Sequence, residues 1–143
     1  MRYFDTSALI KRFVAEPGTQ TVLRLLKEDS LLATSKVAYA EVHAALARRL
    51  RAGDLSRTAF GRISATFERD WPMIMRMELS DPVLFLTREL VSRNPLRGFD
   101  AIHLATALRA RDQLGEKIQF VAADARLLAA AASEELESVD VRA

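Results

Sequence analysis

Short apolar runs alternate with segments of helical pattern along this chain. Five runs are candidates for strands: Arg2–Asp5, Leu31–Thr34, Ile74–Leu79, Ile118–Ala122 and Leu136–Val141. Strands that alternate with helices are typical of a parallel sheet covered on both faces. We therefore predict an α/β fold, a three-layer α/β/α sandwich with a short, mostly parallel central sheet.

Helices are predicted between these runs from apolar periodicity and from residues that favour helix ends. Their expected ranges are Ser7–Val14, Thr19–Asp29, Lys36–Ala52 capped by Ser35, a helix capped by Ser56 and ending near Asp70, Asp81–Arg93, Phe99–Leu114 and a helix opened by Asp124 and ending near Ser133. Asp81-Pro82 has the pattern of an N-cap followed by proline at the first helical position. The run Ile74–Leu79 fits either a strand or a helix end, and we favour a strand.

Composition limits the kind of site that the chain can build. With 143 residues, half of them hydrophobic and 28% charged, residues 1–143 are expected to form one globular domain. Because the chain has no cysteine and two histidines, a metal would be held mainly by oxygen, as Mg²⁺ and Mn²⁺ prefer. The sequence contains no membrane-spanning apolar stretch and no signal peptide, so we expect a cytoplasmic protein.

Three aspartates stand where helices begin. Asp5 ends the first predicted strand and Asp124 follows the strand Ile118–Ala122, so both are expected at the carboxyl edge of the sheet, where α/β proteins bind ligands. Asp100 stands near the start of an apolar helix. For each of them the alternative is a helix cap or a first-turn acid favoured by the helix dipole.

Glu41 is harder to explain as a structural residue. It lies within a predicted helix, and its neighbours one turn away are Val37, Ala38, Ala44 and Ala45. A solvated glutamate usually shares its face with polar residues, and a lone buried carboxylate is costly without a cation or a proton. We therefore expect Glu41 to take part in a site.

The four carboxylates together predict a metal pocket. Carboxylates that are crowded together repel one another, and a divalent cation removes that penalty. A cation held there can polarise a phosphoryl oxygen and activate water, which is the chemistry of phosphodiester hydrolysis. Asp5, Glu41, Asp100 and Asp124 are thus the candidate catalytic and metal-binding residues.

Four sequence motifs resemble those of the PIN-domain nucleases, and in particular the VapC-type toxin ribonucleases of bacterial toxin–antitoxin pairs. The matching stretches are Tyr3–Leu9, Ser35–Val42, Leu96–Ala107 and Phe120–Leu127, in the family's order and over nearly the whole chain. The resemblance implies a PIN-like sandwich and an endoribonuclease that depends on Mg²⁺ or Mn²⁺.

The resemblance also implies roles and partners. Asp5 and Asp100 would be direct metal ligands, Glu41 and Asp124 would complete the acidic pocket, and Thr6 or Ser7 would hold the first aspartate or a metal-bound water. A small antitoxin would block the site, and a homodimer is common in the family. One departure is Ala122, where the family often has threonine or serine, so one hydrogen bond around the site would be missing.

Other residues have two interpretations each. His103 lies one turn after Asp100 and is either a general base or RNA contact or, as we favour, a structural histidine. Trp71 either stacks on a base or, as we favour, packs in the core. The arginines at 48, 49 and 51 either bind phosphate or form a solvated helix end.

Three rival functions remain open. A housekeeping PIN nuclease would share the site but have no antitoxin. A non-catalytic PIN module for RNA or protein binding would be expected to have lost one of the acids. An unrelated phosphotransfer or receiver-like domain would leave Glu41 unexplained, and the chain has no glycine-rich phosphate loop.

Overall fold

A parallel sheet forms the centre of the protein. In a computed structural model, which describes residues 1–29 and 31–143, the strands are β1 (Arg2–Phe4), β2 (Leu32–Ser35), β3 (Met75–Met77), β4 (Gln119–Ala122) and β5 (Ser138–Asp140). Their order is β3-β2-β1-β4-β5, and every pairing between them is parallel. The predicted fold class is confirmed, and each of the five candidate runs overlaps one strand, with β2 extending one residue beyond its predicted range to Ser35.

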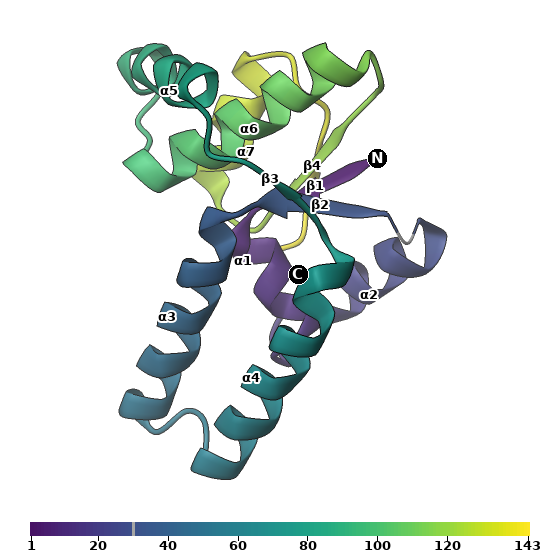
Figure 1. Cartoon of the computed structure of the whole chain (residues 1–143), viewed down its shortest axis with the longest axis vertical. Coiled ribbons are helices and arrows are strands. Elements are labelled where there is room, and N and C mark those ends of the chain that lie inside the picture. Colours follow the sequence, from purple (N-terminus) through teal and green to yellow (C-terminus); the bar gives the residue numbers. More distant parts are fainter. Residues whose placement is uncertain (30) are drawn as a thin grey trace.

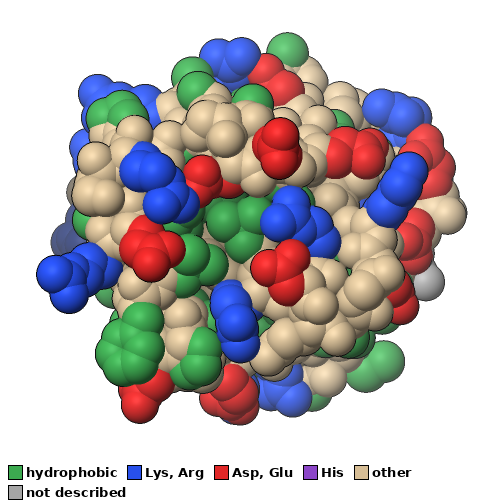
Figure 2. Space-filling view, turned by 90° about the horizontal axis from the view of Figure 1, so that it is seen from above, with side chains coloured by type: hydrophobic (Ala, Val, Ile, Leu, Met, Phe, Trp, Pro, Cys, Tyr) green, Lys and Arg blue, Asp and Glu red, His purple; other side chains and the backbone are tan. Residues whose placement is uncertain are grey.

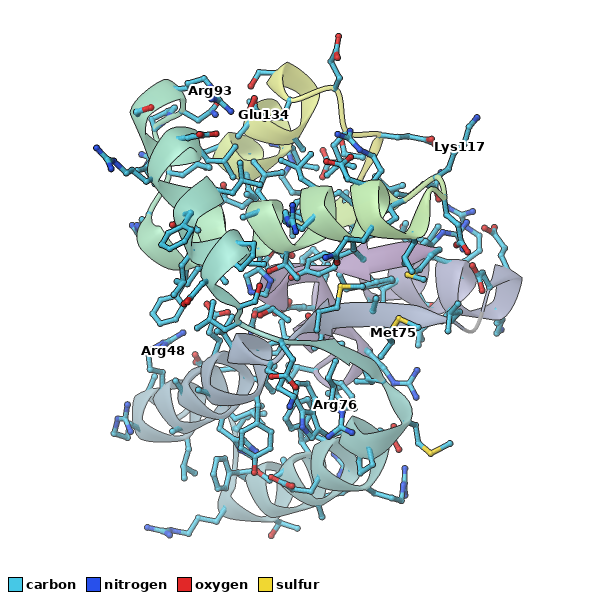
Figure 3. All side chains as sticks on the ribbon, turned by 45° about the horizontal axis from the view of Figure 1, so that its top comes forward. Arg48, Met75, Arg76, Arg93, Lys117 and Glu134 are labelled. Atoms are coloured by element: carbon cyan, nitrogen blue, oxygen red, sulfur yellow. The ribbon has the colours of Figure 1, made fainter. Side chains whose placement is uncertain are left out.

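Helices cover both faces of this sheet (Figure 1). One layer consists of α5 (Asp81–Arg93), α6 (Gly98–Leu114) and α7 (Ala125–Ser133), and an ion pair between Arg93 and Glu134 joins α5 to the end of α7 (Figure 3). The other layer contains α1 (Thr6–Leu9), α2 (Thr19–Glu28), α3 (Val37–Ala52) and α4 (Arg57–Asp70). Figure 1 shows α3 and α4 extending from the sheet as a long helical hairpin.

Alternation along the strands separates two apolar cores. In β1, Tyr3 belongs to the core under α5, α6 and α7, while Phe4 belongs to the core on the α1–α4 side. In β4, Phe120 and Val121 divide in the same way. Because successive strand residues face opposite sides, three or four residues per strand are enough to anchor both helical layers.

Two helix starts differ from the predictions. The segment predicted as Ser7–Val14 begins one residue earlier, because Asp5 is the N-cap of α1. After Leu9 the α-helix gives way to the 3-10 helix η1 (Ile10–Arg12), a narrower helix that is common where α-helices end. Helix α5 is capped by Ser80, whose hydroxyl accepts from Val83 N at 3.4 Å, so Asp81 is its first residue and not its cap.

Helix α3 also starts differently from the prediction. Ser35 is the last residue of β2, and Lys36 takes the N-cap position without a side-chain hydrogen bond. The Ser35 hydroxyl still accepts from Val37 N at 3.2 Å, so it satisfies one of the free amides of the helix start. The strand therefore runs directly into the helix that carries Glu41.

Gly18 has a conformation and a setting that exclude a side chain. Its φ of 94° is left-handed, and a Cβ atom there would lie 1.9 Å from the Val141 carbonyl oxygen. The loop before α2 is thus pressed against the segment after β5. Within the part of the chain described here, no helix is long and apolar enough to cross a membrane.

Candidate active site

The four predicted acids line one cleft, which we call the acidic cleft. Asp5 follows β1, Glu41 lies in the second turn of α3 after β2, Asp100 is in the first turn of α6, and Asp124 caps α7 after β4. The cleft has a volume of about 850 Å³ and opens at the carboxyl edge of the sheet. Parallel strands bring these residues together because each strand ends at that same edge.

Asp5 is buried and tightly held. Its Oδ1 accepts from Ala8 N at 2.9 Å, and Ser7 Oγ lies 2.7 Å from both carboxylate oxygens. Ser7 Oγ in turn accepts from Ala123 N at 2.9 Å, which ties the start of α1 to the segment after β4. Burial raises the pKa of Asp5, although the nearby His103 and the Ser7 hydroxyl act in the opposite direction.

Glu41 is held through one of its two oxygens. Thr6 Oγ1 donates to Oε1 at 2.7 Å, and His103 Nε2 lies 2.7 Å from the same oxygen. Burial alone would raise the pKa of Glu41, but His103 and Thr6 outweigh burial and lower it. The carboxylate predicted from its alanine-rich surroundings thus points into the cleft with fixed neighbours.

His103 contacts Glu41 from the buried side of the cleft. Its side chain is 2% exposed, and Nδ1 lies 2.8 Å from the Tyr3 hydroxyl, which is itself fully buried. The Tyr3 ring stacks on Phe120 with centroids 5.6 Å apart. When the tyrosine donates to Nδ1, Nε2 carries the hydrogen and donates to Glu41. This burial and bonding correspond to the structural histidine that we favoured.

Asp124 and Asp100 complete the cleft wall. Asp124 caps α7: its Oδ1 accepts from Arg126 N at 2.9 Å and from Leu127 N at 3.0 Å. Asp100 is more loosely held, because among the described residues its Oδ2 accepts a single hydrogen bond, from Arg97 N at 3.4 Å. Both therefore serve the helix-start role that we weighed as the alternative, while still lining the cleft.

The negative charges affect one another. Burial is the largest cause of the raised pKa of Asp100, and the charges of Asp124 and Glu41 raise it further. The cleft therefore contains carboxylates close enough to repel, as expected of a site that a cation would neutralise.

The donor set suits a hard divalent cation. Within the described residues, no side chain or amide donates to Glu41 Oε2, Asp100 Oδ1 or Asp124 Oδ2. Carboxylate oxygens are the ligands that Mg²⁺ and Mn²⁺ prefer. As the side chains of the described residues stand, no three acidic or histidine groups are close enough to hold a metal ion directly. Side-chain rotation or bridging water would have to complete the ligand set.

Basic residues also line the acidic cleft. Lys11 and Arg49 both pair with Glu16, and Lys11 Nζ also donates to the Pro17 carbonyl at 2.7 Å. Arg48 and Arg97 line the cleft as well. Of the three α3 arginines identified in the sequence, those at 48 and 49 face the cleft and Arg51 does not.

Two further sequence interpretations concern buried positions. Trp71 is 9% exposed and packs beside Phe67 and Tyr39, so it is a packing residue as we favoured. Ala122 is fully buried in the core under α5, α6 and α7, and does not line the acidic cleft.

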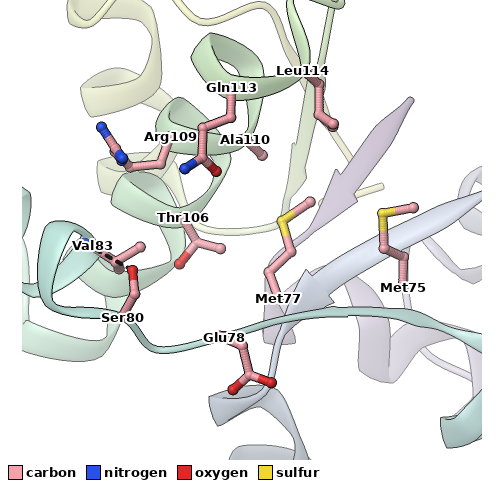
Figure 4. A pocket seen from close by; sticks show the side chains of 10 residues that line it. All are labelled: Met75, Met77, Glu78, Ser80, Val83, Thr106, Arg109, Ala110, Gln113 and Leu114. Carbon is pink, nitrogen blue, oxygen red and sulfur yellow. Dashed lines mark hydrogen bonds between the residues drawn. The ribbon is translucent and has the colours of Figure 1, made fainter.

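A second cleft lies beside the edge strand β3 (Figure 4). We call it the methionine cleft, because Met75 and Met77 both point from β3 toward α6. Its volume is about 360 Å³, and Glu78 is its only acidic lining residue among those the structure describes. A cleft of this composition offers no ligand set for a cation.

The comparisons with known proteins agree with this geometry. A family model for the PIN domain matches residues 2–134. Ribonuclease VapC45 of Mycobacterium tuberculosis is 34% identical over 110 residues, which cover 77% of this chain and 76% of that protein.

Solved structures show the same fold at lower identity. FitAcB from Neisseria gonorrhoeae has a TM-score of 0.73 at 15% identity and covers 99% of both chains. A toxin-antitoxin complex from Klebsiella pneumoniae has a TM-score of 0.64 at 18% identity, covering 90% of this chain and 91% of that one. With the family match, the 34% identity and the shared sandwich in agreement, this chain belongs to the PIN-domain family.

Proposed function

We propose that this chain is a metal-dependent endoribonuclease, and that it acts as the toxin of a toxin–antitoxin pair. The observation that carries the proposal is the acidic cleft: four carboxylates from four separate elements, three of them with an oxygen that receives no donor from the described protein. The relative named ribonuclease VapC45 supports RNA as the substrate.

The residues of the acidic cleft are proposed either to bind the metal ion or to hold its ligands in position. Asp5 and Asp100 are proposed as direct ligands of Mg²⁺ or Mn²⁺, with Glu41 and Asp124 completing the pocket directly or through water. When bound, the ion supplies Lewis acidity and an activated water for phosphodiester hydrolysis. Ser7 fixes Asp5, and Thr6 with His103 fixes Glu41, so the carboxylates keep their positions when RNA enters.

A small antitoxin is proposed as the protein partner, because a structural neighbour is a toxin-antitoxin complex. We also propose that the chain forms one domain and a homodimer, and that it works in the cytoplasm, where its RNA substrate is found. A housekeeping nuclease with the same site is the alternative. Expression in cells distinguishes them: a toxin arrests growth, and the small protein encoded beside it relieves the arrest.

Cleavage of labelled RNA by the purified protein tests the catalytic proposal. Cleavage should require Mg²⁺ or Mn²⁺, stop in EDTA, and fall at least about 100-fold in Asp5→Asn and Glu41→Gln, because each loses a carboxylate of the proposed metal site. Asp140→Asn is the matched control: Asp140 ends β5 but pairs with Arg142 outside the acidic cleft. Equal rates in all the variants would reject the acidic site and favour a binding module.

A further inference from the structure

A glutamate outside the four acids binds two of the positive side chains of the acidic cleft. Lys11 Nζ donates to Glu16 Oε1 at 3.0 Å, and Arg49 pairs with the other carboxylate oxygen, Oε2. All three residues line the acidic cleft, and we call them the Glu16 bridge. In the bridge, one carboxylate is shared by an ammonium and a guanidinium group.

The loop that carries Glu16 is itself held in place. Glu16 N donates to Thr19 Oγ1 at 3.0 Å, and the Thr19 hydroxyl donates to the Val14 carbonyl at 3.2 Å. The same loop offers Lys11 a second acceptor, because Lys11 Nζ donates to the Pro17 carbonyl at 2.7 Å. The position of Lys11 is therefore set by this loop.

Each cation of the bridge is close in the chain to an acid of the cleft. Lys11 lies in η1, which directly follows the helix capped by Asp5. Arg49 stands eight residues after Glu41, about 12 Å farther along α3. Three of the four cleft carboxylates have an oxygen that receives no donor from the described residues. Free lysine or arginine side chains in the same cleft would be drawn to these oxygens.

Solvent weakens this attraction for the more exposed cations. Figure 2 shows basic and acidic side chains interspersed over the helical face above the sheet, where water and salt screen them. Arg48 lines the acidic cleft but is exposed and projects from α3 (Figure 3). Lys11, in contrast, is 7% exposed. The Glu16 bridge thus holds the two least exposed of the four cations that line the cleft among the described residues.

We propose that Glu16 is a positioning residue that keeps Lys11 and Arg49 away from the carboxylates of the acidic cleft, so that these stay available to a divalent cation. The inference rests on the proposed function and adds a residue outside the four acids. When Glu16 is lost, two positive charges are released into the cleft, where they repel a divalent ion and pair with its ligands.

Mn²⁺ binding by isothermal titration calorimetry, without RNA, tests the inference. Glu16→Gln leaves both cations without their carboxylate and should weaken Mn²⁺ binding about tenfold or more. A triple variant combines Glu16→Gln with Lys11→Met and Arg49→Met and so removes the whole bridge. It should bind Mn²⁺ at least as tightly as wild type, because no released cation is left in the cleft.

The triple variant separates this role from a purely structural one. If Glu16 acted only by holding its loop in place, the triple variant would bind Mn²⁺ as weakly as Glu16→Gln. Loss of one partner from a partly buried ion pair can also unfold a protein, and thermal melting by circular dichroism verifies that the variants are folded. The triple variant leaves no bridge cation unpaired, so its Mn²⁺ affinity decides the question even where Glu16→Gln does not fold.

Glu28→Gln is the matched control. Glu28 also binds two cations, because its two carboxylate oxygens pair with Arg2 and Arg24 at 2.9 Å each. None of these three residues lines the acidic cleft. Loss of this carboxylate should therefore leave the Mn²⁺ affinity within about twofold of wild type.

Two outcomes overturn the inference alone: Glu16→Gln that binds Mn²⁺ like Glu28→Gln, and a folded triple variant that binds it as weakly as Glu16→Gln. Wild type that binds no Mn²⁺ overturns the inference together with the proposed metal site. Wild type that binds Mn²⁺ and shows the recovery in the triple variant, but cleaves no RNA, supports the role of Glu16 and rejects the nuclease.

Discussion

The acidic cleft and the methionine cleft both border the same parallel sheet, yet they offer different chemistry. The acidic cleft lies where strands end and helices begin, so its walls carry carboxylates that helix starts and β1 place there. The methionine cleft lies along the side of β3, where alternation sends Met75 and Met77 toward α6. Position relative to the strand ends therefore decides which cleft gathers several carboxylates.

The support around the charged groups also differs. In the acidic cleft, Glu41 is fixed by two neighbours and His103 behind it is fixed by Tyr3. In the methionine cleft, Glu78 is exposed and pairs only with Lys36 among the described residues. A surface ion pair of this kind contributes little to stability. The two clefts therefore differ in that buried polar groups hold a carboxylate in place only in the acidic cleft, among the residues that the structure describes.

The largest effect on Mn²⁺ affinity is expected for Glu41→Gln in the acidic cleft, with Glu78→Gln in the methionine cleft as its control. Glu41→Gln should weaken Mn²⁺ binding about 100-fold or more, because a charged oxygen ligand is lost from the proposed site. Glu78→Gln should leave the affinity within about twofold. Isothermal titration calorimetry measures both, and equal losses would abolish the distinction between the clefts.

Removal of the histidine behind Glu41 should have the next largest effect. In His103→Leu, Glu41 loses the hydrogen bond at Oε1, and Mn²⁺ affinity should fall about 10- to 100-fold. His103→Gln keeps a donor amide and should recover part of that loss, which a purely packing role would not explain. Affinity equal to wild type in His103→Leu would show that Thr6 alone positions Glu41.

A smaller effect on Mn²⁺ affinity is expected for Tyr3, which contacts His103 and not Glu41. Tyr3→Phe leaves His103 Nδ1 without its partner in a fully buried place, which should cost about 1–3 kcal/mol of unfolding free energy. Mn²⁺ affinity should fall less than tenfold, since His103 itself remains. Urea unfolding measures the free energy and calorimetry measures the Mn²⁺ affinity. A larger loss of Mn²⁺ affinity in Tyr3→Phe than in His103→Leu would contradict the idea that Tyr3 acts on Glu41 through His103.

The smallest effect concerns repulsion in the acidic cleft. Burial and neighbouring charges raise the pKa of Asp100, so its ionised form disfavours the folded state at neutral pH, and the penalty disappears as pH falls through the raised pKa. Asp100→Asn should therefore raise the unfolding free energy of metal-free protein at neutral pH by at most about 1 kcal/mol, discounted for its half-exposed position. The difference in unfolding free energy between Asp100→Asn and wild type should shrink at lower pH, where Asp100 itself is protonated.

Asp140→Asn provides the contrast for that measurement. A hydrogen bond from Arg142 lowers the pKa of Asp140, so its contribution stabilises the fold above the unfolded pKa and is lost as pH falls. The variant should be no more stable than wild type at neutral pH. Urea unfolding in EDTA at several pH values measures both, and a gain for Asp140→Asn would show that charge removal alone stabilises the protein.

Local patterns in the sequence explain much of this architecture. Asp5 and Asp124 could be located from strand ends, and Glu41 from its alanine neighbours, because both signals lie within a few residues. The support of Glu41 could not be derived in this way. Tyr3, Thr6 and His103 come from β1, α1 and α6, and their meeting depends on how three elements pack. The ligand set is likewise a matter of side-chain geometry, and its assignment stays a prediction.

Gly18 connects the far end of the chain to the cleft rim. It admits no Cβ because the Val141 carbonyl occupies that space, and the same loop carries Glu16, which orders Lys11 and Arg49. A genetic selection for survivors of the proposed toxin should therefore return alleles at codon 18 as well as at the acidic codons. Such alleles would inactivate the protein through a loop that touches none of its four cleft carboxylates.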